Sequence, residues 1–121
     1  NASIVLRAEV SDDSQRFSML AAGDLEESGA GALLRSDPSA LDADLLKVSH
    51  HGARNGGVEI IDAASPSLAL VSVGADNDYG HPHPSITEHL AQGSIPVART
   101  DRMGAVAIRV QDGALVAEHF G

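Results

Sequence analysis

The sequence predicts an α/β fold with a mixed sheet and flanking helices. In the middle of the chain, short apolar runs typical of strands alternate with helical segments. Near both ends, two strand-like runs follow each other with turn residues between them. The composition of the 121 residues, 43% hydrophobic and 21% charged, is that of a globular protein. No linker or repeat divides the chain, so we expect residues 1–121 to form a single unit.

The first two elements are predicted to be paired strands. Residues 3–10 are apolar and β-rich, and residues 15–22 form a second run of the same kind. Ser and Asp residues between them, at 11–14, are typical of a turn. We therefore expect an antiparallel hairpin. Because this pattern is already under way at the first residues, we expect the chain to be part of a longer one.

The middle of the chain alternates helices with strands. A weak helix is expected at residues 25–35, since two glycines interrupt it, and a strand at 43–49. Next come a short helix at 58–64, which ends before a proline, and a nearly continuous apolar run at 67–74. Such a run predicts a central strand that is covered on both faces. Residues 85–92 complete this part as a helix.

Three closing strands follow, at residues 95–99, 104–110 and 114–119. Asp112 and Gly113 separate the last two, and this dipeptide is a strong signal for a hairpin turn.

The charge balance restricts the chemistry. Seventeen acidic residues against eight basic ones give a net charge of −9. Long-range electrostatic attraction to nucleic acid is therefore disfavoured. Phosphate chemistry at this protein would need a local cation such as a metal ion. The chain has no cysteine, which excludes disulfides, thiolate zinc sites and cysteine nucleophiles. No apolar run approaches the ~20 residues of a membrane span.

Asp24 follows Gly23 at the end of the second predicted strand. Its carboxylate could bind a metal ion. Asp24 could equally cap the following helix, with Glu27 completing a capping box. The two roles are compatible, because a carboxylate has two oxygens.

His50 and His51 directly follow the third predicted strand, just before Gly52. Adjacent residues of an extended strand point to opposite faces. If the strand persists, one imidazole at most faces a given site, and the other supports it, is buried or meets solvent. A break at Gly52 would relax this restriction.

His81 and His83 each precede a proline, which favours extended backbone. Two stiffly held imidazoles suit a metal ligand or a general base. The alternative is a rigid surface turn that leads into the next helix, which Ser85 and Glu88 are expected to open as a capping box.

Thr100 and Asp101 lie in a connection that we expect to be a simple strand turn with Gly104 at positive φ. They could also hydrogen-bond a ligand or a metal-bound histidine. His89 lies in the middle of a predicted helix and is expected at the surface, and His119, near the end of the chain, has no motif around it.

The four candidate histidines and Asp24, in a chain without cysteine, supply mixed nitrogen and oxygen ligands, which suit Zn²⁺ or Mn²⁺. A pair of such ions can lower the pKa of a bound water and neutralise phosphate oxygens. An acidic protein could then cleave a phosphodiester.

The ordered series of these motifs resembles the metallo-β-lactamase-like domain of the ComEC family, from the first residue to about residue 110. ComEC proteins are bacterial competence channels that bring transforming DNA across the inner membrane. The resemblance rests on Gly23-Asp24 after a strand, DLLKVSHHG at 44–52, VSVG at 71–74, YGHPHP at 79–84 and RTD at 99–101.

The resemblance implies an αββα sandwich with a site for two divalent metal ions, Zn or Mn, at the edge of its sheets. It implies nuclease activity on the DNA strand that does not enter the cell. Asp24 matches a ligand that bridges the metals, and His81 matches the final histidine ligand. His50 and His51 match a double-histidine segment near the metals or the substrate phosphate, with His50 as a further metal ligand. Supporting roles fall to three residues: His83, Thr100 and Asp101.

The first ligand motif of the fold, H-x-H-x-D-H, is absent from the chain, and Ala53 stands where the family often has serine. We therefore expect the C-terminal half of the sandwich. Alone it should be inactive and bind little or no metal. Its partners would be the rest of the same polypeptide and DNA, and its bare sheet face predicts self-association. The expected location is the outer face of a bacterial inner membrane.

Two other functions stay open from the sequence. One is a non-catalytic domain that positions DNA or a partner on the channel. The other is a free-standing hydrolase of the same fold that acts on a small phosphoester or a lactone.

Overall fold

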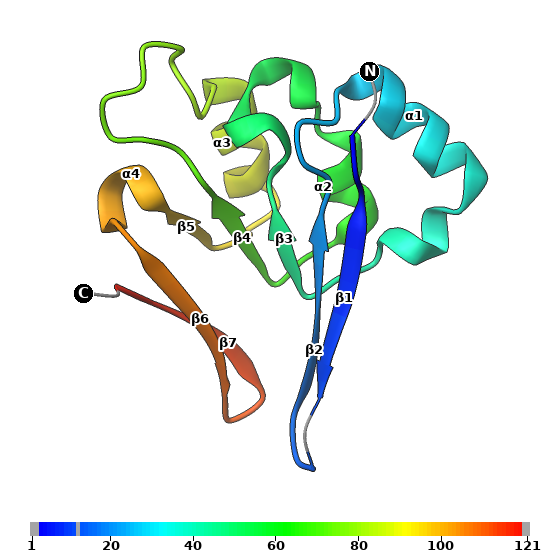
Figure 1. The fold of residues 1–121 in the computed structure, drawn as a ribbon, viewed down its shortest axis with the longest axis vertical. Coiled ribbons are helices and arrows are strands. Elements are labelled where there is room, and N and C mark those ends of the chain that lie inside the picture. Colours follow the sequence, from blue (N-terminus) through cyan, green and yellow to red (C-terminus); the bar gives the residue numbers. More distant parts are fainter. Residues whose placement is uncertain (1–2, 12, 120–121) are drawn as a thin grey trace.

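The computed structural model describes residues 3–11 and 13–119, and contains a five-stranded sheet, a separate two-stranded sheet and helices (Figure 1). The strands are β1 (Leu6–Ser11), β2 (Arg16–Ala21), β3 (Leu45–Lys47), β4 (Leu68–Val71), β5 (Val97–Arg99), β6 (Val106–Gln111) and β7 (Ala114–His119). The helices are α1 (Glu27–Ser36), α2 (Glu59–Ala64), α3 (Pro84–Gln92) and α4 (Thr100–Met103), with 3-10 turns η1 (Pro38–Leu41), η2 (Ser49–Gly52) and η3 (Arg54–Gly56).

The sheet is mixed, so the α/β prediction is confirmed. Its order is β1-β2-β3-β4-β5; β1 pairs antiparallel with β2, and the other neighbours are parallel. Helices α1, α2 and α3 connect the successive parallel strands. Because such crossovers are right-handed, all three helices cover one face of the sheet (Figure 1).

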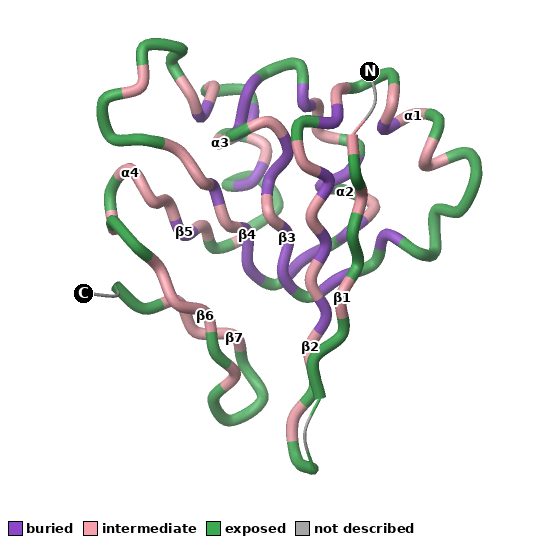
Figure 2. The backbone as a smooth tube through the Cα atoms, in the orientation of Figure 1, coloured by how far each residue is buried: buried purple, intermediate pink, exposed green. Residues whose placement is uncertain are grey.

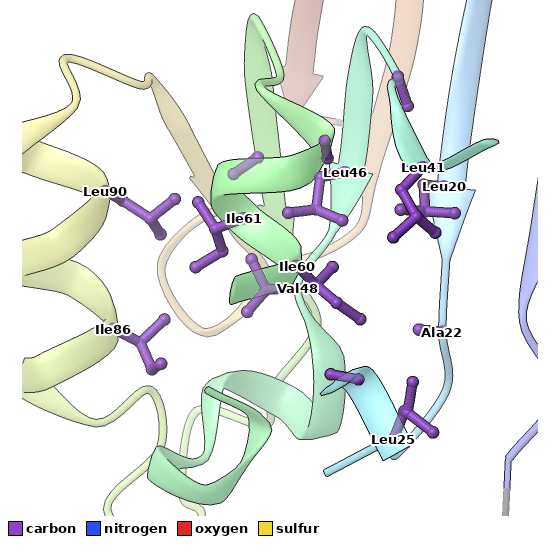
Figure 3. Packing of buried hydrophobic residues seen from close by; sticks show 14 of the residues in the cluster. Leu20, Ala22, Leu25, Leu41, Leu46, Val48, Ile60, Ile61, Ile86 and Leu90 are labelled. Carbon is purple, nitrogen blue, oxygen red and sulfur yellow. The ribbon is translucent and has the colours of Figure 1, made fainter. Parts of the chain in front are cut away.

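The main hydrophobic core lies between that face and the helices (Figures 2 and 3). Leu20 and Leu46 from the strands, Ile60 from α2 and Ile86 and Leu90 from α3 are almost completely buried. Figure 3 shows their side chains converging from opposite sides of the core. Replacing a buried leucine or isoleucine of this kind by alanine costs roughly 2–5 kcal/mol. This core anchors the strand ends that carry the site.

Most predicted elements are present with shifted ends. The apolar run at 67–74 forms β4 only over Leu68–Val71, and the strand expected at 95–99 is Val97–Arg99. The connection expected after β5 contains the short helix α4, and Gly104, which follows it, has a φ of +71°. The expected turn at 11–14 includes Asp12, which lies outside the described residues.

The opposite face of the sheet is also apolar. Leu45 and Leu68 are buried on it, while Leu6 and Val10 of β1 are 55% and 51% exposed. The β6–β7 hairpin belongs to a separate sheet and is not hydrogen-bonded to this one. The β1 side of this face is therefore exposed, and an exposed apolar surface of this kind favours association.

We expect this chain to self-associate through the β1 side of that face. Lysine substitutions of Leu6 and Val10 together should shift the chain towards monomer, because two charges would then need to be desolvated in the contact. Light scattering across a concentration series tests this. A wild-type chain that stays monomeric at high concentration would contradict it.

Candidate functional site

Three loops meet at the ends of neighbouring strands. Asp24 follows β2, His50 and His51 follow β3, and His81 lies in the long loop after β4. These four side chains, with those of Val73, Asn77 and Tyr79 and the backbone of Gly74, line one cavity of about 460 Å³. The carboxyl ends of adjacent parallel strands are where ligand sites gather in open α/β sheets.

The turn at His50 and His51 differs from the expected strand. Strand β3 ends at Lys47, and both histidines take left-handed backbone conformations, with φ of 54° and 56°. Both rings line the same cavity, and the restriction to opposite faces does not apply because the strand does not persist to these residues. The His50 N–H donates to the Gly23 carbonyl at 3.0 Å, which ties this turn to the Asp24 loop. Left-handed non-glycine residues cost about 1–3 kcal/mol each and are concentrated at functional sites.

His51 and Asp24 bring an imidazole nitrogen and a carboxylate oxygen near each other in the cavity. The Nδ1 of His51 lies 2.8 Å from the Ser72 carbonyl oxygen. A carbonyl only accepts, so Nδ1 carries the proton and Nε2 of the neutral ring has a free lone pair. This Nε2 lies 3.6 Å from Asp24 Oδ1, which is too long for a hydrogen bond.

The 3.6 Å separation matches two ligands of a single divalent ion. Bonds of roughly 2.0–2.2 Å in tetrahedral geometry place two ligand atoms about 3.3–3.6 Å apart. Histidines that bind metal also commonly donate their second N–H to a backbone carbonyl, as His51 does to Ser72. The Asp24–His51 pair is therefore well arranged to share a divalent cation.

His50 and His81 add two imidazoles to the same cavity. Their rings are in edge contact, with centroids 6.1 Å apart, and Nδ1 of His50 is buried without a hydrogen-bond partner in the described part of the chain. Burial lowers the pKa of His81, and the neighbouring His50, His51 and His83 lower it further. His81 is thus neutral at pH 7 and has a lone pair to offer.

The donors fit part of a divalent-ion site. Their chemistry, imidazole nitrogen with carboxylate oxygen, is that of Zn²⁺ or Mn²⁺ ligands. Within residues 3–11 and 13–119, no group of three or more His, Asp or Glu side chains is placed to hold an ion by itself. A complete coordination sphere would need donors in addition to Asp24 and His51.

Asn77 is a structural residue of the site that the sequence reasoning missed. Its side-chain amide donates to the carbonyls of Gly74 and His81 at 3.0 and 3.1 Å, and its oxygen accepts the His81 N–H at 3.0 Å. The loop that carries Tyr79 and His81 is therefore closed at its base. An asparagine in a polar loop is the available signal, because asparagine often bonds nearby backbone.

Thr100 and Asp101 do not line the cavity. The Thr100 hydroxyl donates to the Val73 carbonyl at 2.8 Å and accepts the Val73 N–H at 2.7 Å. These two hydrogen bonds hold the backbone of Val73, which follows Ser72, and the Ser72 carbonyl orients His51. Asp101 instead makes a two-contact ion pair with Arg99, at 2.7 and 3.0 Å.

Asp101→Asn should weaken the fold in a pH-dependent way. The Arg99 guanidinium holds the pKa of Asp101 below its ordinary value of 3.8. The ion pair therefore stabilises the native state above pH 3.8, and its contribution declines as pH falls through the lowered pKa. Urea unfolding should show a loss of about 1–3 kcal/mol at pH 7 that shrinks below about pH 4. An equal loss at pH 7 and at the lowest pH measured would contradict this account.

His83 caps helix α3. Its Nδ1 accepts the Ser85 N–H at 3.0 Å, Pro84 occupies the first helical turn, and Ser85 is already inside the helix. The predicted capping box of Ser85 and Glu88 is therefore wrong. His83 also contacts the turn that contains His50 and His51, because the backbone N–H of His83 donates to the Gly52 carbonyl at 2.8 Å.

The cap predicted at Asp24 is also wrong. Helix α1 begins at Glu27 with Glu26 in the capping position, two residues beyond Asp24. The carboxylate of Asp24 faces His51 instead.

We expect His83→Ala to destabilise the protein by about 1 kcal/mol, because the Ser85 N–H loses its acceptor. His83→Asn should retain most of the stability, since asparagine is a good cap. Chemical denaturation of the three proteins measures the difference. If alanine and asparagine at this position have equal effects, the cap contributes nothing.

No family model matches the chain. It is 36% identical over 113 residues to ComE operon protein 3 of Bacillus subtilis, an overlap of 93% of this chain and 14% of that protein. It is 28% identical over 103 residues to competence protein ComA of Neisseria gonorrhoeae, covering 84% of this chain and 15% of that protein. The chain thus spans about one seventh of these relatives. The similarities support a relation to competence-related DNA-uptake proteins.

The described residues include no helix with both the length and the apolar character that crossing a bilayer requires.

Proposed function

We propose that this chain is part of a metal-dependent nuclease unit in a competence-related DNA-uptake protein. The substrate is the DNA strand that is not transported. The observation that carries the proposal is the Asp24–His51 pair, 3.6 Å apart in a cavity that also contains His50 and His81. The similarity to competence proteins supplies the biological setting.

Each residue of the pair has a defined role in this proposal. Asp24 supplies a carboxylate oxygen and His51 its Nε2 to a divalent ion, and the Ser72 carbonyl keeps His51 in the required tautomer. A bound ion would activate water and neutralise phosphate charge. His50 and His81 face the same cavity, where a neutral imidazole can hydrogen-bond a phosphate oxygen or take up a proton.

The charge of the chain agrees with a metal-dependent site. With 17 acidic and 8 basic residues, the protein repels a polyanion on average. An ion at Asp24 and His51 would create the local positive charge that a phosphodiester needs.

The fold proposal is the C-terminal half of a metallo-β-lactamase-like sandwich. Three helices on one face of the sheet, an apolar second face and a separate β6–β7 hairpin are compatible with half of such a sandwich. The rest of the same polypeptide would supply the remaining ligands, and DNA would bind to the completed unit. We place this unit on the outer face of the bacterial inner membrane.

Metal removal tests the proposal. The full-length protein is treated with a chelator, then resupplied with Mn²⁺ or Zn²⁺ and incubated with labelled single-stranded and duplex DNA. We expect cleavage only with added ion. Ion-independent cleavage, or no cleavage with either ion, would contradict the proposal, and normal DNA uptake without cleavage would favour a non-catalytic domain.

A further inference from the structure

Tyr79 presents an aromatic ring at the surface beside the candidate site. The tyrosine is 82% exposed. Its ring stacks on His81, with centroids 5.7 Å apart and an angle of 27° between the planes. The sequence contains one tyrosine, two phenylalanines and no tryptophan. One of its few aromatic rings is thus supported on one side by an imidazole and open to a ligand.

The ring stands at the border of two cavities. Tyr79 and His81 line the cavity of Asp24 and His51, and they also line a second cavity of about 490 Å³. Arg54 and Asn55 also line the second cavity. A ligand stacked on Tyr79 would therefore lie next to the cavity of Asp24 and His51 and in a cavity that a guanidinium also lines.

Arg54 is available for an anionic ligand. It is exposed and makes no ion pair with any residue that the structure describes, and no other lysine or arginine among these residues lines either cavity. Half of the basic side chains are engaged in ion pairs with carboxylates: Arg7, Arg16, Arg99 and Arg109. Glu27 also lines the second cavity and weakens the attraction for anions. Affinity there must come mainly from stacking.

The loop that carries the ring is prearranged. The Asn77 amide holds the backbone of Gly74 and His81 together across the loop. His81 in turn supports the Tyr79 ring. A ligand would therefore find the aromatic surface in place and would not need to order it.

We propose that Tyr79 is a stacking platform for a base of single-stranded DNA, with Arg54 contacting a phosphate of the same strand. This positions the strand for cleavage at Asp24 and His51, and so rests on the proposed function. Every base has a flat face, so such a platform tolerates any sequence but requires an unpaired base. Tyr79 is a positioning residue in this proposal.

Binding without cleavage tests the platform. Fluorescence anisotropy of a labelled single-stranded oligodeoxynucleotide is measured with the full-length protein in the presence of a chelator. Tyr79→Ala should weaken binding about five- to a hundredfold, and Tyr79→Phe, which keeps the ring, should bind within about twofold of wild type. Arg54→Gln should weaken binding and reduce the salt dependence by about one phosphate contact. Arg35→Gln, an equal charge change at the end of α1, should have little effect.

An abasic strand provides a second test. Wild-type protein should bind the strand more weakly when one base is removed at the stacking position, scanned along the oligonucleotide. Tyr79→Ala should not distinguish the intact from the abasic strand, because the partner of the base is gone. In cleavage assays this variant should raise KM and leave kcat largely unchanged.

Three results would overturn the platform. The Tyr79→Ala variant could bind the single strand as tightly as wild type does, or Tyr79→Phe could bind it as weakly as Tyr79→Ala does. The third such result is that the wild-type protein binds duplex DNA more tightly than single-stranded DNA. The two proposals fail separately. If Asp24→Asn abolishes cleavage while Tyr79→Ala changes neither binding nor KM, the nuclease proposal stands and the platform is wrong. If no cleavage occurs at all, the nuclease proposal fails, and loss of binding in Tyr79→Ala with retention in Tyr79→Phe still supports the platform.

Discussion

Replacing Gly52 by alanine is expected to lower the free energy of unfolding by about 2–4 kcal/mol and to disrupt the candidate site. Gly52 has a φ of +80°, and a Cβ added there would lie 2.6 Å from Pro82 Cβ and 2.9 Å from Pro82 Cα. Since Pro82 Cα is a backbone atom, no side-chain rotation relieves this clash, and the two loops would have to separate. His81 precedes Pro82, so its imidazole would move away from His50 and His51.

The chain offers a matched control at Gly113. This glycine has a φ of +79°, and no atom lies within 4 Å of an added Cβ. Gly113→Ala therefore measures the cost of the left-handed backbone alone, about 1–2 kcal/mol. Urea unfolding of the chain, and titration of the full-length protein with Zn²⁺, should show a larger destabilisation and weaker ion binding for Gly52→Ala alone. Equal destabilisation of the two variants, with ion binding intact in both, would mean that the contact with Pro82 does not hold the site together.

Asp24→Asn is expected to weaken divalent-ion binding by on the order of a hundredfold or more. Loss of a residue that merely supports a ligand costs roughly 10–100-fold, and the substituted amide would lack the negative charge of the carboxylate ligand itself. Cleavage of DNA by the full-length protein should fall at least in parallel. Calorimetric titration with Zn²⁺ or Mn²⁺ and a nuclease assay give the two readouts.

His51→Gln provides the complementary test. If Asp24 and His51 share one ion, the double variant Asp24→Asn/His51→Gln should bind that ion only a little more weakly than either single variant does. The reason is that the effects of two ligands of one ion are coupled. Asp112→Asn is a suitable control, since it removes one carboxylate at a hairpin turn whose positive φ of 53° asparagine tolerates. Additive losses, or an equal loss in the control, would argue against a shared ion.

The sequence predicted the architecture well where side-chain pattern determines structure. The apolar run around Leu68–Val71 indicated a central strand, and β4 indeed lies between β3 and β5. The α/β alternation indicated a mixed sheet with flanking helices, and the carboxyl ends of the parallel strands β2 and β3 bring Asp24, His50 and His51 together in space. The roles assigned to these residues remain predictions.

Local backbone geometry was less predictable. Strand periodicity would place His50 and His51 on opposite faces only if the strand persisted, and periodicity carries no information about where a strand ends or about two successive left-handed residues. The prediction of the residue that caps α3 failed for a similar reason. Serine is the usual cap, so Ser85 was preferred, whereas the Nδ1 of His83 performs this role just ahead of it in the chain. The contributions of Asn77 and Thr100 depend on contacts between separate segments, which a single sequence does not reveal.

The central claim is that Asp24 and His51 hold one divalent ion between them. Anomalous X-ray scattering from crystals of the full-length protein, which contains the remaining ligands, grown with Zn²⁺ or Mn²⁺ tests it most directly. The account predicts a peak roughly 2.0–2.2 Å from both an Asp24 carboxylate oxygen and His51 Nε2. An ion bound elsewhere while these two side chains stay uncoordinated, or no peak at saturating concentrations of either ion, would contradict it.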